Sequence, residues 1–305
     1  MRVASPYAFG VAAGLALCGW IVVGAGCRLG FDAPQAGEDA NGQVRGVDAS
    51  RSDAAVDAGG APDAMPDSMI DAMVDAAPAP AAVWKQATPT QVGAGSTLAA
   101  SLPNQPFVGN TVVVWVWSWA WGSSTFAPAS VTDNAGNTYE LLVSSGIDGG
   151  ACSGGAAAGA IYMSRLTSVS GALTITVDPE GDESQQLSMA AAEYGLVRHE
   201  LPPVATSSVI AAAPSPLLVQ TGNIEVDGPS LLVGLASECG GYPEPVTWAP
   251  GDGWITRAEE PRTSGIAPGS AIEQIADGGG SFAARWTLTY LSADQPAFAM
   301  MAAIR

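Results

Sequence analysis

The fold is decided by the stretch TVVVWVWSWAW, residues 111–121. Valine and tryptophan are typical of β-strands, and in a strand Val112, Val114 and Val116 share one face while the tryptophans share the other. Because both faces are apolar, this strand is predicted to lie in the middle of a sheet.

Strand-like alternation recurs downstream, broken by clusters of Gly, Pro, Asn and Asp. The other predicted strands are Ala129–Thr132, Thr138–Ser144, Ala157–Leu166, Leu173–Val177, Gln186–Leu196, Ser230–Glu238, Trp254–Glu259, Ser270–Ile275, Phe282–Leu291 and Ala297–Ile304. This pattern predicts an all-β domain over residues 83–305. A two-sheet antiparallel sandwich of jelly-roll type fits best, and a single barrel would satisfy the same alternation.

The first 26 residues have the features of an export signal. Arg2 precedes a charge-free apolar run, Ala8–Gly26, and the small residues Gly24, Ala25 and Gly26 precede Cys27. This arrangement resembles a bacterial lipoprotein signal, which implies cleavage before Cys27, lipidation of its thiol and, with Arg28 next, an outer-membrane location. An ordinary signal peptide and an uncleaved helix are the alternatives.

Residues 27–82 are predicted to form a disordered linker between the lipid and the domain. Ten acidic residues face three arginines there, a net charge of −7, and the text is rich in Ala, Asp and Pro. Such a chain buries too little apolar surface to offset its ordering entropy. The alternative is that residues 65–74 fold as a helix on a partner.

Charge and composition exclude several functions. The chain carries 11 basic and 29 acidic residues, a net charge of −18, which would repel nucleic acid and anionic lipid, so the only membrane contact expected is the N-terminal lipid. It has a single histidine, His199, and a single lysine, Lys85, so a zinc cluster and a phosphate-binding loop lack their parts. No cofactor is therefore expected, calcium excepted.

Three motifs carry a second resemblance. They are the turn Val131–Tyr139, the segment Gly171–Thr176 and the strand residues Ala191–Gly195. Together they resemble a β-sandwich domain of secreted bacterial surface proteins, over about Gly109–Arg305. The resemblance implies a sandwich fold and no assigned activity.

The row of tryptophans is the first candidate ligand site. Trp119 and Trp121, near the end of their strand, are predicted to be exposed and to stack on sugar rings, and the alternative is packing in the core. If the strands run strictly up and down, the loops 122–127, 146–156 and 179–185 lie at this same end. Asp148, Asp178 and Asp182 would then supply hydrogen bonds to the ligand.

The acidic loop after residue 177 is a candidate calcium site. Asp178, Glu180, Asp182 and Glu183 are oxygen ligands at alternating spacing. A solvated acidic turn is the alternative, because the loop lacks the glycine that an EF-hand requires.

Cys152 and Cys239 are predicted to form a disulfide, since two thiols of an exported domain usually pair. The bridge would close a loop of 87 residues (239 minus 152), worth about 4 kcal/mol.

The sequence shows no clear set of catalytic residues. His199 lies in a turn, and no Gly-x-Ser-x-Gly elbow accompanies it. Glu193, inside a strand, is best explained by a structural hydrogen bond.

The prediction is therefore a cell-envelope lipoprotein that displays a non-catalytic binding or adhesion module for glycans or another surface protein. The alternatives are a glycoside hydrolase with paired carboxylates on the same fold and a structural envelope protein without a small ligand.

Overall fold

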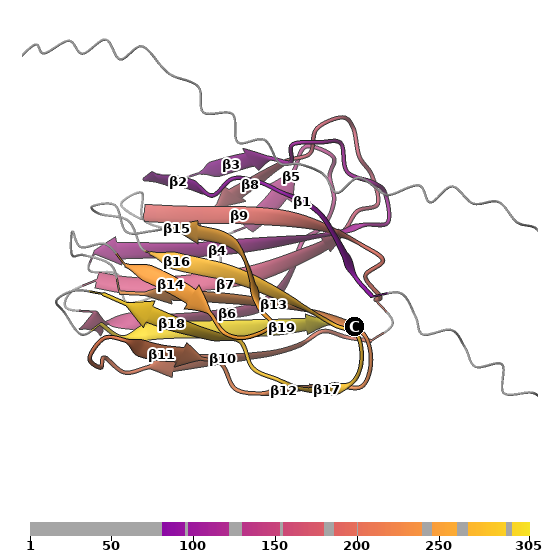
Figure 1. The fold of residues 1–305 in the computed structure, drawn as a ribbon. Coiled ribbons are helices and arrows are strands. Elements are labelled where there is room, and N and C mark those ends of the chain that lie inside the picture. Colours follow the sequence, from indigo (N-terminus) through magenta and orange to yellow (C-terminus); the bar gives the residue numbers. More distant parts are fainter. Residues whose placement is uncertain are drawn as a thin grey trace, which may run out of the picture. The chain divides into compact units, whose positions relative to one another are not determined.

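The computed structural model describes residues 81–94, 97–121, 130–152, 155–179, 186–199, 201–239, 246–260, 268–290 and 295–305 (Figure 1). For Ala94, Trp121 and residues 148–150 only the backbone is described. The described residues belong to one compact unit, Ser68–Arg305. The predicted signal and Cys27 lie outside them, as does the predicted linker apart from its last two residues.

The described chain is all-β and antiparallel, as predicted, and it has two halves of similar length. The first half, residues 81–199, contains β1 (Val83–Ala87), β2 (Gln91–Ala94), β3 (Leu98–Ser101), β4 (Thr111–Trp121), β5 (Ser130–Asp133), β6 (Glu140–Cys152), β7 (Gly155–Arg165), β8 (Thr174–Asp178) and β9 (Gln186–Gly195). The second half, residues 201–305, contains β10 (Val204–Ile210), β11 (Leu217–Gln220), β12 (Ile224–Val226), β13 (Ser230–Glu238), β14 (Thr247–Pro250), β15 (Ile255–Glu260), β16 (Gly269–Ala276), β17 (Gly280–Phe282), β18 (Arg285–Thr289) and β19 (Ala297–Ile304).

Each half consists of a large and a small sheet. The large sheet of the first half has the order β1-β9-β4-β7-β6, with β2 also paired to β9, and the small sheet has the order β3-β8-β5. In the second half the large sheet is β10-β19-β13-β16-β15 and the small one is β11-β18-β14, with β12 and β17 forming a separate pair. In both halves the first strand lies beside the last, and the chain moves repeatedly between the two sheets, which is the winding of a jelly roll.

The two halves share one topology. Replacing β1, β9, β4, β7 and β6 by β10, β19, β13, β16 and β15 converts the first large sheet into the second, and β3-β8-β5 corresponds in the same way to β11-β18-β14. The sequence therefore builds the same sandwich twice.

Hydrogen bonds confirm this correspondence residue by residue. Ser101 pairs with Thr174 in the first half, and Gln220 pairs with Arg285 in the second. The next amide donates in both cases, from Leu102 to Leu173 C=O and from Thr221 to Ala284 C=O, each at 3.0 Å.

The sheets form four layers with three apolar interiors. Val112, Val114 and Val116 of β4 pack against the small sheet of the first half. The tryptophan face of β4 packs instead against the large sheet of the second half. The far face of that sheet packs against the second small sheet, around Trp286. Both large sheets are thus buried on both faces, which explains why β4, β13 and β19 carry apolar residues on both faces.

Most long strands were predicted closely and the short ones were not. The exception is β6, the longest described strand, which was predicted to end at Ser144 but runs to Cys152, so most of the predicted loop 146–156 is strand. Residues 111–121, 230–238 and 297–304 form strands with the predicted bounds, whereas the predicted strand 282–291 is divided between β17 and β18. β1, β2, β3, β10, β11, β12 and β14 were missed. Many of these lie at sheet edges, where a short, partly exposed strand leaves little hydrophobic alternation in the sequence.

Candidate functional site

Trp115, Trp117 and Trp119 lie in the core and do not form a ligand platform. Trp115 and Trp117 are fully buried and Trp119 is only 2% exposed. The prediction that Trp119 is exposed is therefore wrong, because the large sheet of the second half covers this face with residues such as Leu235 and Phe298. Trp121 ends β4 opposite Gly155, and its side chain lies outside the described part of the structure.

The predicted acidic rim is only partly described. Asp178 is exposed at the end of β8, opposite Ser130. The side chain of Asp148 and the residues Glu180, Asp182 and Glu183 lie outside the described residues. Among the residues that the structure does describe, no three His, Cys, Asp or Glu side chains cluster as a metal site would require. Calcium binding stays a prediction.

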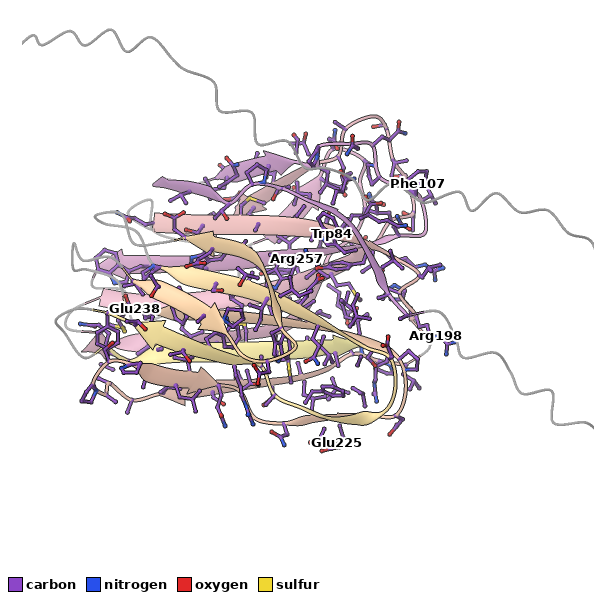
Figure 2. All side chains as sticks on the ribbon, viewed as in Figure 1. Trp84, Phe107, Arg198, Glu225, Glu238 and Arg257 are labelled. Atoms are coloured by element: carbon purple, nitrogen blue, oxygen red, sulfur yellow. A yellow bond between two sulfur atoms is a disulfide. The ribbon has the colours of Figure 1, made fainter. Side chains whose placement is uncertain are left out.

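The predicted disulfide is confirmed. Cys152 at the end of β6 is bonded to Cys239, directly after β13, with their Cα atoms 5.3 Å apart. The bridge joins the two halves covalently at the end opposite the entry of the chain; in Figure 2, Glu238 marks the bridged end and Arg198 the other.

His199 and Glu193 each make hydrogen bonds to neighbouring residues of the fold. The Nε2 of His199 is 2.8 Å from the Thr111 hydroxyl, and burial, followed by the charge of Arg165, lowers the pKa of the imidazole. Glu193 is buried and accepts hydrogen bonds from the Gln86 side chain (2.6 Å), the Phe107 amide (3.0 Å) and the Asn110 side chain (2.6 Å). The structural interpretation of Glu193 is confirmed.

A buried ionic cluster crosses between the halves. Glu273 of β16 is fully buried, accepts the hydroxyl hydrogen bond of Tyr194 from β9 and pairs with Arg257 of β15. Arg257 also lies over the Trp84 ring, 4.6 Å from its centroid (Figure 2). Burial, and then the Glu273 carboxylate, hold the pKa of Tyr194 well above its usual range, so the phenol keeps the proton that it donates. Sequence patterns gave no sign of this cluster.

A surface hollow of about 290 Å³ lies in the second half, where the β14–β15 turn meets β16 and β18. We call it the Trp254 hollow. Its lining residues are Asn223, Gly251, Asp252, Trp254, Gln274, Ser281, Phe282, Ala283 and Arg285. It therefore combines two aromatic rings with amide, carboxylate, hydroxyl and guanidinium groups.

Three polar side chains of the hollow make no hydrogen bond or ion pair with any described residue: Asp252, Gln274 and Arg285. Asn223, in contrast, donates to the Ser281 hydroxyl at 3.1 Å. Polar groups that converge on a hollow without partners of their own are available to a ligand.

The first half shows what this position looks like when it is closed. The Asn134 amide donates to Thr174 C=O (3.1 Å), as the Gly251 amide donates to Arg285 C=O (2.8 Å), and the glycine two residues on has a positive φ in both turns, 77° at Gly136 and 81° at Gly253. The two turns therefore correspond, and Asn137 stands where the second half has Trp254.

Asn137 seals its turn to the next loop. The side-chain oxygen of Asn137 accepts hydrogen bonds from the backbone amides of Thr167 (2.8 Å) and Ser168 (3.0 Å). Its side-chain NH₂ group donates to Ser168 C=O (3.0 Å). The Asp133 carboxylate fixes Asn137 in place by accepting a hydrogen bond from the Asn137 backbone amide at 3.1 Å. In the second half Pro250 stands at the position of Asp133 and Trp254 at that of Asn137. The side-chain hydrogen bonds of Asn137 and Asp133 therefore have no counterpart there.

The Trp254 hollow was missed by the sequence analysis, which assigned Trp254 to the start of a strand. One signal was available. Aligning VTDNAGNTY (residues 131–139) with WAPGDGWIT (residues 248–256) shows that the second turn keeps the positive-φ glycine and loses both Asp133 and Asn137.

Comparison with protein-family models, with curated proteins and with solved structures gives no match. Among the described residues there is no helix long and apolar enough to cross a membrane. The function is therefore argued from the residues of this chain.

Proposed function

We propose that the protein is an exported, lipid-anchored binding module that takes a glycan in the Trp254 hollow. The observation that carries this is the set of unpartnered polar side chains, Asp252, Gln274 and Arg285, around a hollow that also holds an indole. The residues differ from the predicted pair Trp119 and Trp121, and the ligand class is the same.

Sugar chemistry fits the lining. A sugar ring offers hydroxyls that both donate and accept, and apolar C–H faces that pack on aromatic rings. Asp252 can only accept, Arg285 can only donate and the Gln274 amide can do both. Trp254 is 8% exposed, so only a small part of its indole is open to a ligand.

Export rests on the N-terminal sequence. The resemblance of residues 1–27 to a lipoprotein signal supports lipidation of Cys27 and an outer-membrane location, and the acidic linker 27–82 supports display of the domain at a distance from the lipid. The resemblance of the turn and strand motifs to secreted surface domains supports the same setting.

Binding is favoured over hydrolysis at this site. Glycoside hydrolysis needs two carboxyl groups flanking the bond, and among the described residues that line the hollow Asp252 is the one carboxylate.

The test is glycan binding by the mature chain and its variants. A glycan array identifies a ligand, and calorimetry then measures its Kd for wild type, Asp252→Asn and Gln274→Ala. Loss of a hydrogen bond to a charged group is expected to make Asp252→Asn bind about 10- to 100-fold more weakly. Near-UV circular dichroism establishes that each variant is folded.

Two further variants locate the site. Glu225→Gln removes an exposed acid from neighbouring β12, outside the hollow, and should leave the Kd unchanged. Asp178→Asn probes the acidic rim predicted from the sequence. A loss of binding in Asp178→Asn with none in Asp252→Asn would place the ligand at that rim, and an array without any bound glycan would refute the proposal as a whole.

A further inference from the structure

Arg285 gives the Trp254 hollow a positive charge, in a chain whose net charge is −18. Arg257 is paired with Glu273, and Arg305 lies 4.0 Å from Asp227 and donates to Pro202 C=O. Arg285 is exposed, and although Asp252 lines the same hollow, the two form no ion pair, nor does Arg285 pair with another described acid.

The position of Arg285 is fixed by the turn beside it. Its carbonyl oxygen accepts the Gly251 amide at 2.8 Å, and a Cβ on Gly251 would come within 3.0 Å of the Arg285 Cβ. Arg285 therefore begins β18 pressed against the turn that carries Asp252.

The first half again supplies the comparison. The residue corresponding to Gly251 is Asn134, whose side-chain oxygen accepts the Thr174 amide (3.0 Å) and whose NH₂ group donates to Ala172 C=O (3.0 Å). Thr174 itself bonds to the Ser101 hydroxyl at 2.8 Å. In the first half the polar groups at this position are therefore hydrogen-bonded to one another. In the second half the corresponding residues are Gly251 and Arg285, and the Arg285 guanidinium forms no ion pair with a described acid.

We infer, on the basis of the proposed function, that the glycan is acidic: it carries a carboxylate that pairs with Arg285, while its hydroxyls bond to Asp252 and Gln274. A planar guanidinium matches a carboxylate with two parallel hydrogen bonds, which gives both energy and orientation. Because the chain has a net charge of −18, the attraction between Arg285 and a carboxylate acts only at short range. A sugar acid placed against Arg285 is favoured, and a dense polyanion is repelled by the remainder of the chain.

The test uses probes that differ in the carboxylate alone. The mature chain is applied to an array of uronic and sialic glycans, each printed beside its methyl ester, and calorimetry follows for the tightest pair. Wild type is expected to bind the free acid at least about 10-fold more tightly than the ester, the usual worth of a charge-assisted hydrogen bond. Arg285→Gln should abolish this difference and leave ester binding nearly unchanged.

Two matched variants complete the design. Arg285→Lys keeps the charge but not the fork and should retain part of the preference. Arg165→Gln removes one positive charge from the end of β7, outside the hollow, and should keep all of it.

The outcomes separate the two proposals. Equal affinity for acid and ester, with binding still lost in Asp252→Asn, would overturn the acidic ligand and leave glycan binding intact. A preference for the acid that survives Arg285→Gln would overturn the role of Arg285. No binding to any glycan, acid or neutral, would remove both.

Discussion

At the scale of single residues, two buried carboxylates are stabilised in different ways. Glu193 is neutralised by no cation: its oxygens accept hydrogen bonds from Gln86, Asn110 and the Phe107 amide within the first half. Glu273 has a cation, Arg257, and a phenol, Tyr194, and these come from different halves. Glu273 thus makes a buried polar contact that links the two halves.

Replacing Glu273 by Ala is expected to destabilise the protein by about 3–5 kcal/mol, because it leaves the half-buried Arg257 without its acid and the buried Tyr194 hydroxyl without its acceptor. Urea unfolding followed by tryptophan fluorescence measures this change. Asp227→Asn is the control: Asp227 is exposed and 4.0 Å from Arg305, so its loss should cost less than about 1 kcal/mol. Equal costs for the two variants would show that the buried cluster contributes nothing special.

Sequence reasoning at this scale succeeded where chemistry restricts the partner and failed where the partner comes from elsewhere in the chain. Two cysteines in an exported domain have few alternatives to pairing, so Cys152 and Cys239 were predicted. Trp119 was misplaced because exposure depends on what covers a face, and the covering sheet lies over 100 residues downstream. Asp252 was overlooked because an acid in a glycine-rich turn is ordinary until the hollow around it is seen.

At the scale of the element, β4 and β16 explain how large rings fit between the central sheets. Trp117 projects from β4 into the interface of the halves, and Gly269 of β16 lies against its ring. A Cβ on Gly269 would come within 2.6 Å of the Trp117 Nε1. Glycine is therefore needed at this position for a close approach.

Gly269→Ala is expected to destabilise the fold by about 1–3 kcal/mol, because a buried indole cannot turn away without displacing its neighbours. The measurement is the free energy of unfolding in urea, with Gly278→Ala as the matched control. Gly278 is exposed and an added Cβ would meet nothing within 4 Å, so that variant should be neutral. A neutral Gly269→Ala would mean that the two central sheets are packed loosely.

At the scale of the whole molecule, the two jelly rolls depend on each other. Each large sheet presents an apolar face that is buried by the other half. Burying one tryptophan on folding removes about 200 Å² from water, worth about 5 kcal/mol, so Trp115, Trp117 and Trp119 contribute at most about 15 kcal/mol to the interior that the halves share. A half on its own would expose this apolar face to water, although each half also has an interior of its own. The alternating pattern predicted a single two-sheet sandwich over residues 83–305. The sandwich architecture is confirmed, but the chain builds it twice, and the duplication was not visible because the period of the strands is the same in either case.

Residues 81–200 and 201–305 expressed separately are therefore expected to be insoluble, since each would expose its half of the shared interior. Expressed together in an oxidising compartment, they should form a soluble complex held by that interior and by the Cys152–Cys239 bridge. Non-reducing electrophoresis should show one band, and reduction should yield two. With Cys239→Ser the complex should still assemble and should dissociate on dilution, because only the non-covalent contact remains. A soluble first half that unfolds cooperatively alone would show that the tryptophan row needs no cover, and the molecule would then be two domains in series.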